Sequence, residues 1–251
     1  MAAQKEQTTV GIIGFGRFGP VLAQLLAPTH KVVVHDIIDV SQRAEAVGAQ
    51  AVDWDTVSTA PTIFLAVPIR YFKETVARLV SKVLPGTTVF DVCSVKVYPA
   101  TVMKEYFPPE VITIASHPLF GPDSSLRGYQ DLPIMMHPVS PRSEHFDNWA
   151  GYFREQGLRV LEMTPEEHDR LAARSQGITH FIGRVLKEFG IESTPIDTEG
   201  CRDLQLVVEQ TCHDSYELFH DLENYNPYTT EMVDAVLKAV QQVKQSIQRR
   251  E

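Results

Sequence analysis

The sequence is short of cysteine, of long apolar runs and of positive charge, and each shortage excludes a class of protein. Its 251 residues include only Cys93, Cys201 and Cys212 as cysteines, widely spaced, so we expect reduced thiols and no disulfide framework. No apolar run approaches the roughly 18 residues of a membrane helix. A net charge of -9 argues against nucleic acid, because phosphate binding depends on clustered lysine and arginine. These shortages indicate a soluble, globular protein that binds small molecules.

The first residues, Met1 to Thr9, are polar and lead directly into a strand-like run. They contain neither the apolar centre of a signal peptide nor the arginine-rich pattern of a transit peptide. We therefore expect a cytoplasmic protein without a membrane partner. No spacing of histidine and carboxylate residues suggests a metal site, and none is predicted.

The first half of the sequence alternates short apolar runs with helix-like stretches, which is typical of a parallel α/β sheet. Two later strand-like runs flank a polar helical stretch at about 142–156 and would complete the sheet. The expected strands are Thr9 to Ile13, Lys31 to His35, Ala49 to Val52, Thr62 to Val67, Thr88 to Asp91, Val111 to Ala115, Leu132 to Met136 and Arg159 to Met163.

The pattern changes at Thr164, which opens a capping box with Pro165 and Glu167. We predict helices from there to Gly190, from about 200 to 223, and from about 230 to the C-terminus. The predicted domains are residues 1–163, a dinucleotide-binding domain, and residues 164–251, a helical domain for substrate binding and dimerisation. Three helices alone cannot readily bury their apolar faces, so we expect a homodimer formed through this part.

A glycine-rich loop follows the first strand and precedes the helical run Val21 to Leu26. Gly14, Gly16 and Gly19 form a G-x-G-x-x-G pattern, and a second strand ends at Asp36, 22 residues after Gly14. This context predicts a dinucleotide site at the N-terminus of a helix, although glycines can also merely form a turn. The expected cofactor-binding residues are Gly14, Phe15, Gly16, Arg17, Phe18, Gly19, Asp36, Val67 and Pro68.

The end of the second strand favours NAD over NADP. A carboxylate at Asp36 accepts hydrogen bonds from ribose hydroxyls and repels a 2'-phosphate, and Ile37 offers no positive charge. Arg17 and Arg43 remain alternative partners for a phosphate, so NADP stays open.

Candidate catalytic residues follow the fifth and sixth strands, where ligands bind in an open parallel sheet. Ser94 lies in the segment Asp91 to Lys96, and His117 lies in the segment Ser116 to Asp123. An imidazole with an ordinary pKa of about 6.5 is suited to take a proton from an alcohol as hydride leaves the same carbon. From position alone, His117 is equally well explained as a turn residue.

Taken together, these motifs resemble the prephenate and arogenate dehydrogenase family of tyrosine biosynthesis, especially its plant-type branch. The resemblance covers most of the chain. The matching segments are Gly14 to Gly19, Ser94-Val95-Lys96, His117-Pro118, Phe120-Gly121-Pro122, Glu167-His168-Asp169, Ser175-Gln176, Thr179-His180 and Glu192 to Thr198.

The resemblance implies an enzyme that oxidatively decarboxylates a cyclohexadienyl acid, with substrate held between a dinucleotide-binding domain and a helical dimerisation domain. It makes His117 the residue that deprotonates the ring hydroxyl and Ser94 its support. It also places Gln176, His180, Thr198 and Thr211 in the substrate pocket. The residue that binds the ring carboxylate stays open between Arg127, Arg170, Arg174 and a side chain of a partner subunit.

Substrate preference depends on Asp214. By the resemblance, arogenate-preferring members carry aspartate at this position, because a carboxylate attracts the ammonium group of arogenate. Without the resemblance, Asp214 is more simply solvated or paired with Arg184 or Arg202. We predict arogenate as substrate. The alternatives are a prephenate or dual-specificity dehydrogenase and, more distantly, a sensor module that binds NAD without turnover.

Overall fold

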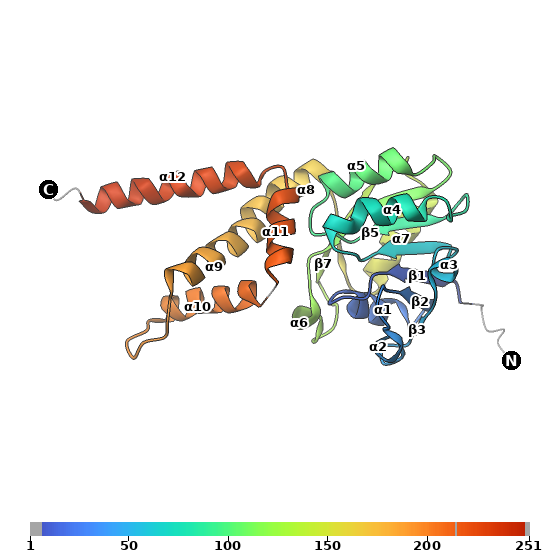
Figure 1. The fold of residues 1–251 in the computed structure, drawn as a ribbon, viewed down its shortest axis with the longest axis horizontal. Coiled ribbons are helices and arrows are strands. Elements are labelled where there is room, and N and C mark those ends of the chain that lie inside the picture. The colour runs from blue at the N-terminus through green and yellow to red at the C-terminus, as the bar shows by residue number, and fades with distance from the viewer. Residues whose placement is uncertain (1–6, 214, 249–251) are drawn as a thin grey trace. The chain divides into compact units, whose positions relative to one another are not determined.

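The computed structural model describes residues 7–213 and 215–248, and its elements are labelled in Figure 1. The chain divides into two compact units, one that ends at Pro165 and one that begins at Glu166.

The first unit is built on an eight-stranded sheet with the strand order β3-β2-β1-β4-β5-β6-β7-β8. This confirms the predicted α/β fold with a mainly parallel sheet. The strands are β1 (Thr9–Ile13), β2 (Lys31–His35), β3 (Ala49–Ala51), β4 (Thr62–Leu65), β5 (Thr88–Asp91), β6 (Ile112–Pro118), β7 (Pro133–Pro138) and β8 (Arg159–Glu162).

One strand pair departs from the parallel arrangement, because β6 and β7 run antiparallel while every other neighbouring pair is parallel. The reason lies in the connection between them. Its only helix is the four-residue α6 (Pro122–Ser125), whereas a parallel crossover usually contains a full helix that packs on the sheet. The chain therefore returns beside β6 in the opposite direction.

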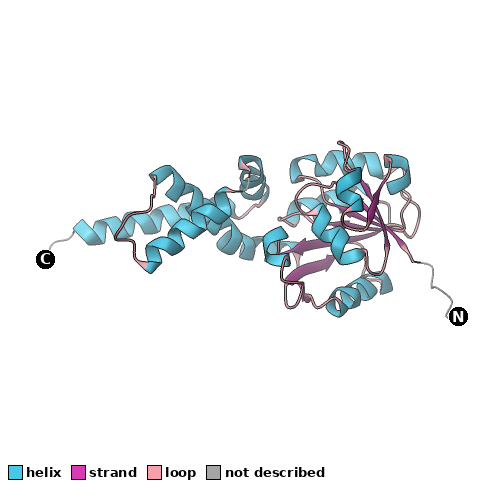
Figure 2. Cartoon of the chain, turned by 90° about the horizontal axis from the view of Figure 1, so that it is seen from below, coloured by secondary structure: helices cyan, strands magenta, loops and turns pink. Residues whose placement is uncertain are grey.

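Helices cover both faces of this sheet, as Figure 2 shows. Both faces of the central strands are consequently apolar, as expected for a parallel sheet. Besides α6, these helices are α1 (Gly19–Leu26), α2 (Ser41–Glu45), α3 (Trp54–Val57), the 3-10 turn η1 (Ile69–Tyr71), α4 (Phe72–Leu79), α5 (Val97–Tyr106) and α7 (Glu144–Glu155).

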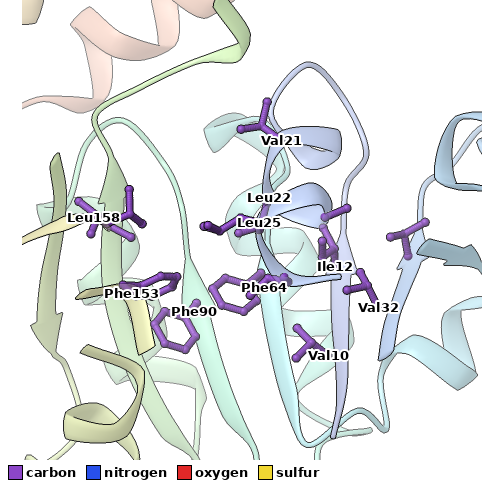
Figure 3. Close-up of a cluster of buried hydrophobic side chains, with 14 of the residues drawn as sticks. Val10, Ile12, Val21, Leu22, Leu25, Val32, Phe64, Phe90, Phe153 and Leu158 are labelled. Carbon is purple, nitrogen blue, oxygen red and sulfur yellow. The ribbon is translucent and has the colours of Figure 1, made fainter. Parts of the chain in front are cut away.

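The core of the first unit is built around stacked aromatic rings on one face of the sheet (Figure 3). Phe64 and Phe90 are neighbours in the register of β4 and β5, and their ring centroids are 4.4 Å apart. Phe153 of α7 and Leu22 of α1 pack against the same cluster. This packing fixes the strand ends that carry the predicted site.

The second unit is helical. Its elements are α8 (Pro165–Ala172), the π-helical turn η2 (Ala173–Gly177), α9 (Ile178–Phe189), α10 (Glu199–Cys212), α11 (Tyr216–Tyr225) and α12 (Thr229–Gln248). The expectation of one helix over 200–223 was wrong, because α10 and α11 are separate helices and Ser215 caps the second by accepting a hydrogen bond from Leu218 N at 3.2 Å. The single helix expected up to Gly190 is interrupted by η2.

Two helices of this unit pack unusually closely, because α9 and α10 meet at a glycine. A Cβ atom on Gly183 would lie only 2.0 Å from the Thr211 hydroxyl oxygen. That hydroxyl donates a hydrogen bond to the Val207 carbonyl at 2.8 Å, so it is held in place. The absence of a side chain at Gly183 is thus what permits the crossing.

Across residues 7–213 and 215–248, the structure contains no helix that is both long enough and apolar enough to cross a membrane.

Candidate active site

The glycine loop between β1 and α1 gives each of its three glycines a distinct role. Gly14 has a φ of 95°, and a Cβ atom there would lie 2.5 Å from the Ala66 carbonyl oxygen. A Cβ atom on Gly19 would lie 2.9 Å from the Gly14 carbonyl oxygen, so this glycine allows α1 to pack on the loop. Gly16 has nothing within 4 Å of its missing Cβ atom. That open side is where a pyrophosphate can approach the backbone at a helix N-terminus.

Asp36 is held against this loop at the end of β2. Its Oδ2 atom accepts a hydrogen bond from the backbone N–H of Phe15 at 2.6 Å, and its Oδ1 atom accepts one from Ile38 N at 3.2 Å. Val67 and Pro68 follow β4, and Val67 N would lie 2.9 Å from a Cβ atom on Gly14. The structure therefore brings together the glycine loop, Asp36 and the segment after β4, as the sequence analysis expected.

A pocket of about 390 Å³ lies beside Asp36, at the ends of β2 and β3. Its lining includes three carboxylates, Asp36, Asp39 and Asp53, and no lysine or arginine. Hydrogen bonds from Ser41 lower the pKa of Asp39, and those from Thr56 lower the pKa of Asp53. Two of the three carboxylates thus keep their charge well below neutral pH. The pocket suits hydroxyl groups better than a phosphate.

Two arginines near the loop differ in what they contact. Arg43 of α2 donates a hydrogen bond from Nη2 to the Gly16 carbonyl at 2.9 Å, and its guanidinium lies 5.5 Å from the centre of the Phe15 ring. Arg17, by contrast, is exposed on the loop itself. The next residue, Phe18, packs against the core of the first unit, with its ring centroid 6.0 Å from that of Phe120. Arg43 therefore stabilises the conformation of the loop.

Ser94 and His117 lie at the carboxyl ends of the neighbouring strands β5 and β6. Ser94 is half-buried in the loop after β5, whereas His117 is 4% exposed. From the sequence, His117 was expected to follow its strand, but β6 extends to Pro118 and includes it. Because β1, β4, β5 and β6 are parallel, these two residues lie at the same edge of the sheet as the glycine loop.

A buried ion pair joins the two segments that carry Ser94 and His117. Lys96 Nζ donates to Asp91 Oδ1 and to the Ser116 carbonyl, and neither charged side chain is exposed. Asp91 accepts further hydrogen bonds from Cys93 N at 3.0 Å and Ser116 N at 3.2 Å. The Ser116 hydroxyl donates to the Asp91 carbonyl at 2.6 Å. This network fixes the residues next to Ser94 and His117 relative to each other.

Burying this network disfavours the charged form of Asp91. Burial raises the pKa of the Asp91 carboxyl, while the Lys96 ammonium and the two backbone N–H groups act in the opposite direction. The sequence contained the Ser94-Val95-Lys96 motif but no sign that Lys96 pairs with Asp91, since the two are joined by folding. Lys96 and Asp91 are residues of this site that sequence reasoning missed.

The residues expected to bind substrate in the helical unit lie in different settings. His180 on α9 is buried, Gln176 in η2 is half-buried, and Thr211 is buried against Gly183. Thr198 is exposed and caps α10 by accepting a hydrogen bond from Cys201 N at 3.3 Å. Asp214, on which the predicted substrate preference depends, lies outside the described residues.

Buried polar groups also surround η2. His168 Nδ1 lies 2.8 Å from Asp169 Oδ1, and the Asp169 carbonyl accepts a hydrogen bond from Asn226 Nδ2 at 2.8 Å. Glu223 of α11 is different, because both carboxylate oxygens are buried and the Thr229 hydroxyl is the group that favours their charge. Burial raises the pKa of Glu223 to about 7. No sequence signal distinguished Glu223 from a solvated helix residue.

Within the part of the chain that the structure describes, no group of three or more histidine, cysteine or acidic side chains is arranged to hold a metal ion. Cys93, Cys201 and Cys212 form no disulfide bonds.

Comparison with family models and relatives gives consistent matches. Residues 24–161 match the model described as "Prephenate dehydrogenase, nucleotide-binding domain", and residues 185–251 match "TYRAAT1-like, C-terminal domain". The chain is 34% identical over 248 residues to arogenate dehydrogenase 2, chloroplastic, of Arabidopsis thaliana. This match covers 95% of this chain and 69% of the relative. Arogenate dehydrogenase 1, chloroplastic, of the same plant is 32% identical, and the match covers 94% of this chain but only 38% of the relative.

Solved structures have the same fold at lower identity. Prephenate dehydrogenase from Aquifex aeolicus, in complex with hydroxyphenyl propionate and NAD+, superposes with a TM-score of 0.80 at 19% identity and covers 98% of this chain and 92% of its own. Synechocystis arogenate dehydrogenase gives a TM-score of 0.72 at 21% identity, with 96% and 91% covered.

Proposed function

Because this chain belongs to the prephenate dehydrogenase family, as its motifs suggested, we propose that it oxidatively decarboxylates L-arogenate to L-tyrosine. The family is one of nicotinamide-dependent oxidoreductases. The observation that carries the proposal is the buried pair of Lys96 and Asp91, which ties the Ser94 loop to the His117 strand at the edge where the glycine loop lies.

In the proposed mechanism, His117 accepts the proton of the ring hydroxyl, while Ser94 forms a hydrogen bond with the same oxygen. A bound nicotinamide supplies the acceptor for the hydride that leaves the carbon carrying that hydroxyl. The ring carboxylate departs as CO2, the electron pair of its C–C bond enters the ring, and the ring oxygen regains the proton held by His117. Aromatisation makes this step favourable, so the protein needs to provide only a base and correct orientation.

The preference for arogenate over prephenate rests on the predicted role of Asp214 and on the names of the two plant relatives. A carboxylate close to the substrate side chain rewards an ammonium group and fails to reward a keto group. Gln176, His180, Thr198 and Thr211 remain the proposed substrate-binding residues, in a helical domain from residue 164 onward.

NAD is the proposed cofactor. The glycine loop fits a dinucleotide, because the side of Gly16 is open and Asp36 is fixed beside it. Three carboxylates and no cation line the neighbouring pocket, which disfavours a 2'-phosphate. Replacing Asp36 with Ser and Ile37 with Arg should therefore shift the preference toward NADP, measured as the ratio of kcat/KM for the two cofactors.

The proposed assembly is a homodimer formed by the helical domain. The second half of α12 supports this proposal, because Leu237, Val240, Val243 and Ile247 are each at least half exposed. Their spacing of three or four residues places them on one side of the helix. A helix with such a stripe requires an apolar partner surface.

The deciding experiment measures reduction of NAD and of NADP with arogenate and with prephenate. The proposal expects the highest kcat/KM for NAD with arogenate. Asp214→Asn should move the ratio of arogenate to prephenate turnover toward prephenate, and an unchanged ratio would exclude Asp214 as the residue that sets the substrate preference.

His117→Ala distinguishes an enzyme from a module that only binds NAD. The variant should keep its affinity for NAD and lose at least about a hundredfold in kcat, because general base catalysis typically contributes that much. A rate close to that of the wild type would exclude His117 as the base.

A further inference from the structure

Arg184 lies next to two of the proposed substrate-binding residues. It follows His180 by four residues within α9, so the two side chains share one face of the helix. Its Nη2 atom also donates a hydrogen bond to the Thr211 carbonyl at 3.4 Å, near the end of α10. Arg184 is therefore hydrogen-bonded to Thr211 and lies one helical turn from His180.

Burial distinguishes Arg184 from the other cationic side chains of the helical unit. Within residues 166–213 and 215–248, every other lysine and arginine is exposed, whereas Arg184 is half-buried. Arg174, which the sequence analysis considered for carboxylate binding, is 71% exposed and faces Glu231 at 3.5 Å. The exposed set is Arg170, Arg174, Lys187, Arg202, Lys238 and Lys244.

Two aromatic rings of α11 hold the guanidinium of Arg184. Its central carbon lies 5.6 Å from the ring centre of Tyr216 and 5.3 Å from that of Phe219. Such contacts fix the plane of a guanidinium while its N–H edges remain able to donate. A planar donor of this kind matches the two oxygens of a carboxylate.

We propose that Arg184 binds the side-chain carboxylate of the cyclohexadienyl substrate, an inference that rests on the proposed function. The substrate carries two carboxylates into a protein whose net charge is -9, so a positioned cation is needed. Arg184 combines that charge with partial burial and with contacts to the proposed pocket.

The chemistry of the reaction decides which carboxylate Arg184 binds. The ring carboxylate loses its charge as CO2 leaves, so a tight ion pair there would stabilise the substrate more than the transition state and slow the reaction. The side-chain carboxylate is unchanged from substrate to product, and binding it carries no such penalty. Asp214, the predicted partner of the ammonium on the same carbon, follows Thr211 by three residues.

The test compares Arg184→Gln and Arg184→Lys with a matched control, Arg202→Gln, which removes an exposed arginine of α10. Loss of a charge-assisted hydrogen bond predicts that Arg184→Gln raises KM for arogenate by roughly 10- to 100-fold with kcat nearly unchanged. Arg184→Lys should show a smaller increase, because it keeps the charge and loses the planar donor. Arg202→Gln should leave KM unchanged, and the affinity for NAD should stay constant throughout.

Binding of the product L-tyrosine, measured by calorimetry, separates the two carboxylates, because L-tyrosine keeps only the side-chain one. Weakening by a similar factor in Arg184→Gln would support the assignment, whereas unchanged L-tyrosine affinity with a raised KM would overturn it. A fall in kcat with unchanged KM would also overturn it, and so would wild-type KM in a folded Arg184→Lys. L-tyrosine binding does not require turnover. Wild-type protein that bound L-tyrosine without oxidising arogenate would refute only the proposed function. Wild-type protein that neither bound L-tyrosine nor oxidised arogenate would refute the proposed function and the role of Arg184 together.

Discussion

At the scale of single residues, Lys96 is fully buried in the first unit. It carries a charge into an interior where its side chain is not exposed, and Asp91 and the Ser116 carbonyl are its partners. An ion pair of this kind adds little stability compared with apolar residues of similar size. Its value lies in the single geometry that it imposes on the segments carrying Ser94 and His117.

Lys96→Met should therefore lower both stability and rate. Removing one partner leaves the Asp91 carboxylate buried and uncompensated, which costs about 3–5 kcal/mol. Urea unfolding should show this decrease, and kcat should fall because the His117 segment loses its support. Lys104→Met, at an exposed position of α5, is the control and should change neither quantity. A Lys96→Met protein with wild-type kcat would contradict a positioning role.

Glu223 makes stability depend on pH in the direction opposite to most carboxylates. Its pKa is raised to about 7 from an ordinary value of 4.5, so between these values the folded protein keeps a proton that the unfolded chain has lost. The free energy of unfolding should consequently fall as pH rises from 4.5 to 7 and level off above that. Glu223→Gln should remove this contribution. The free energy of unfolding of the variant, minus that of the wild type, should therefore increase as pH rises from 4.5 to 7. A difference independent of pH would contradict the assignment.

At the scale of elements, two glycine-to-alanine substitutions in the glycine loop should have different effects. One should affect the stability of the fold, and the other should affect only cofactor binding. Gly14→Ala places a Cβ atom 2.5 Å from the Ala66 carbonyl at a φ of 95°, so it should strongly destabilise the fold. Gly16→Ala meets no atom within 4 Å, so its melting temperature should stay close to that of the wild type. Its added methyl group faces the side where the pyrophosphate approaches, so NAD affinity should fall at least about tenfold, as calorimetry would measure. Unchanged affinity in Gly16→Ala would place the cofactor elsewhere.

The elements that the sequence predicted well are those whose signal is local. The apolar runs of β1 and β2, the G-x-G-x-x-G pattern and Gly190, which ends α9 at a φ of 77°, depend on residues close together in the chain. The direction of β7 was not predictable in this way. Its antiparallel pairing accompanies a connection without a full crossover helix, and an apolar run reads the same in either direction.

The parts of the site that escaped prediction depend on contacts between distant residues. Lys96 meets the Ser116 carbonyl across 20 positions of sequence, and only the pairing of β5 with β6 brings them together. Glu223 is an ordinary surface residue by sequence pattern, but the structure buries both of its oxygens. The separation of α10 from α11 was missed because the apolar spacing continues through the break.

At the scale of the whole molecule, the proposed homodimer depends on the apolar stripe of α12, whose second half projects past the other helices of its unit in Figure 1. Val240→Glu with Val243→Glu places charges on two side chains that are each 58% exposed. If a second copy covers the stripe, sedimentation should change from dimer to monomer, because buried unpaired carboxylates are costly. Glu substitutions at Gln241 and Gln245, outside the stripe, should leave the assembly unchanged. A dimer that survives the first pair would exclude this surface.

The π-helical turn at Ala173–Gly177 sets the rotational register of every side chain that follows it on α9. Such a turn contains about one residue more than an α-helical turn, and each residue of an α-helix advances about 100° around the axis. Deletion of a single residue here would restore a regular α-helical turn and keep His180 and Arg184 on the same face, whereas deletion within the regular part of α9 would rotate every later side chain by about 100°. The segment Ala173–Gly177 should thus tolerate the loss of one residue more easily than the rest of α9, whereas insertions should be accepted only beyond Gly190.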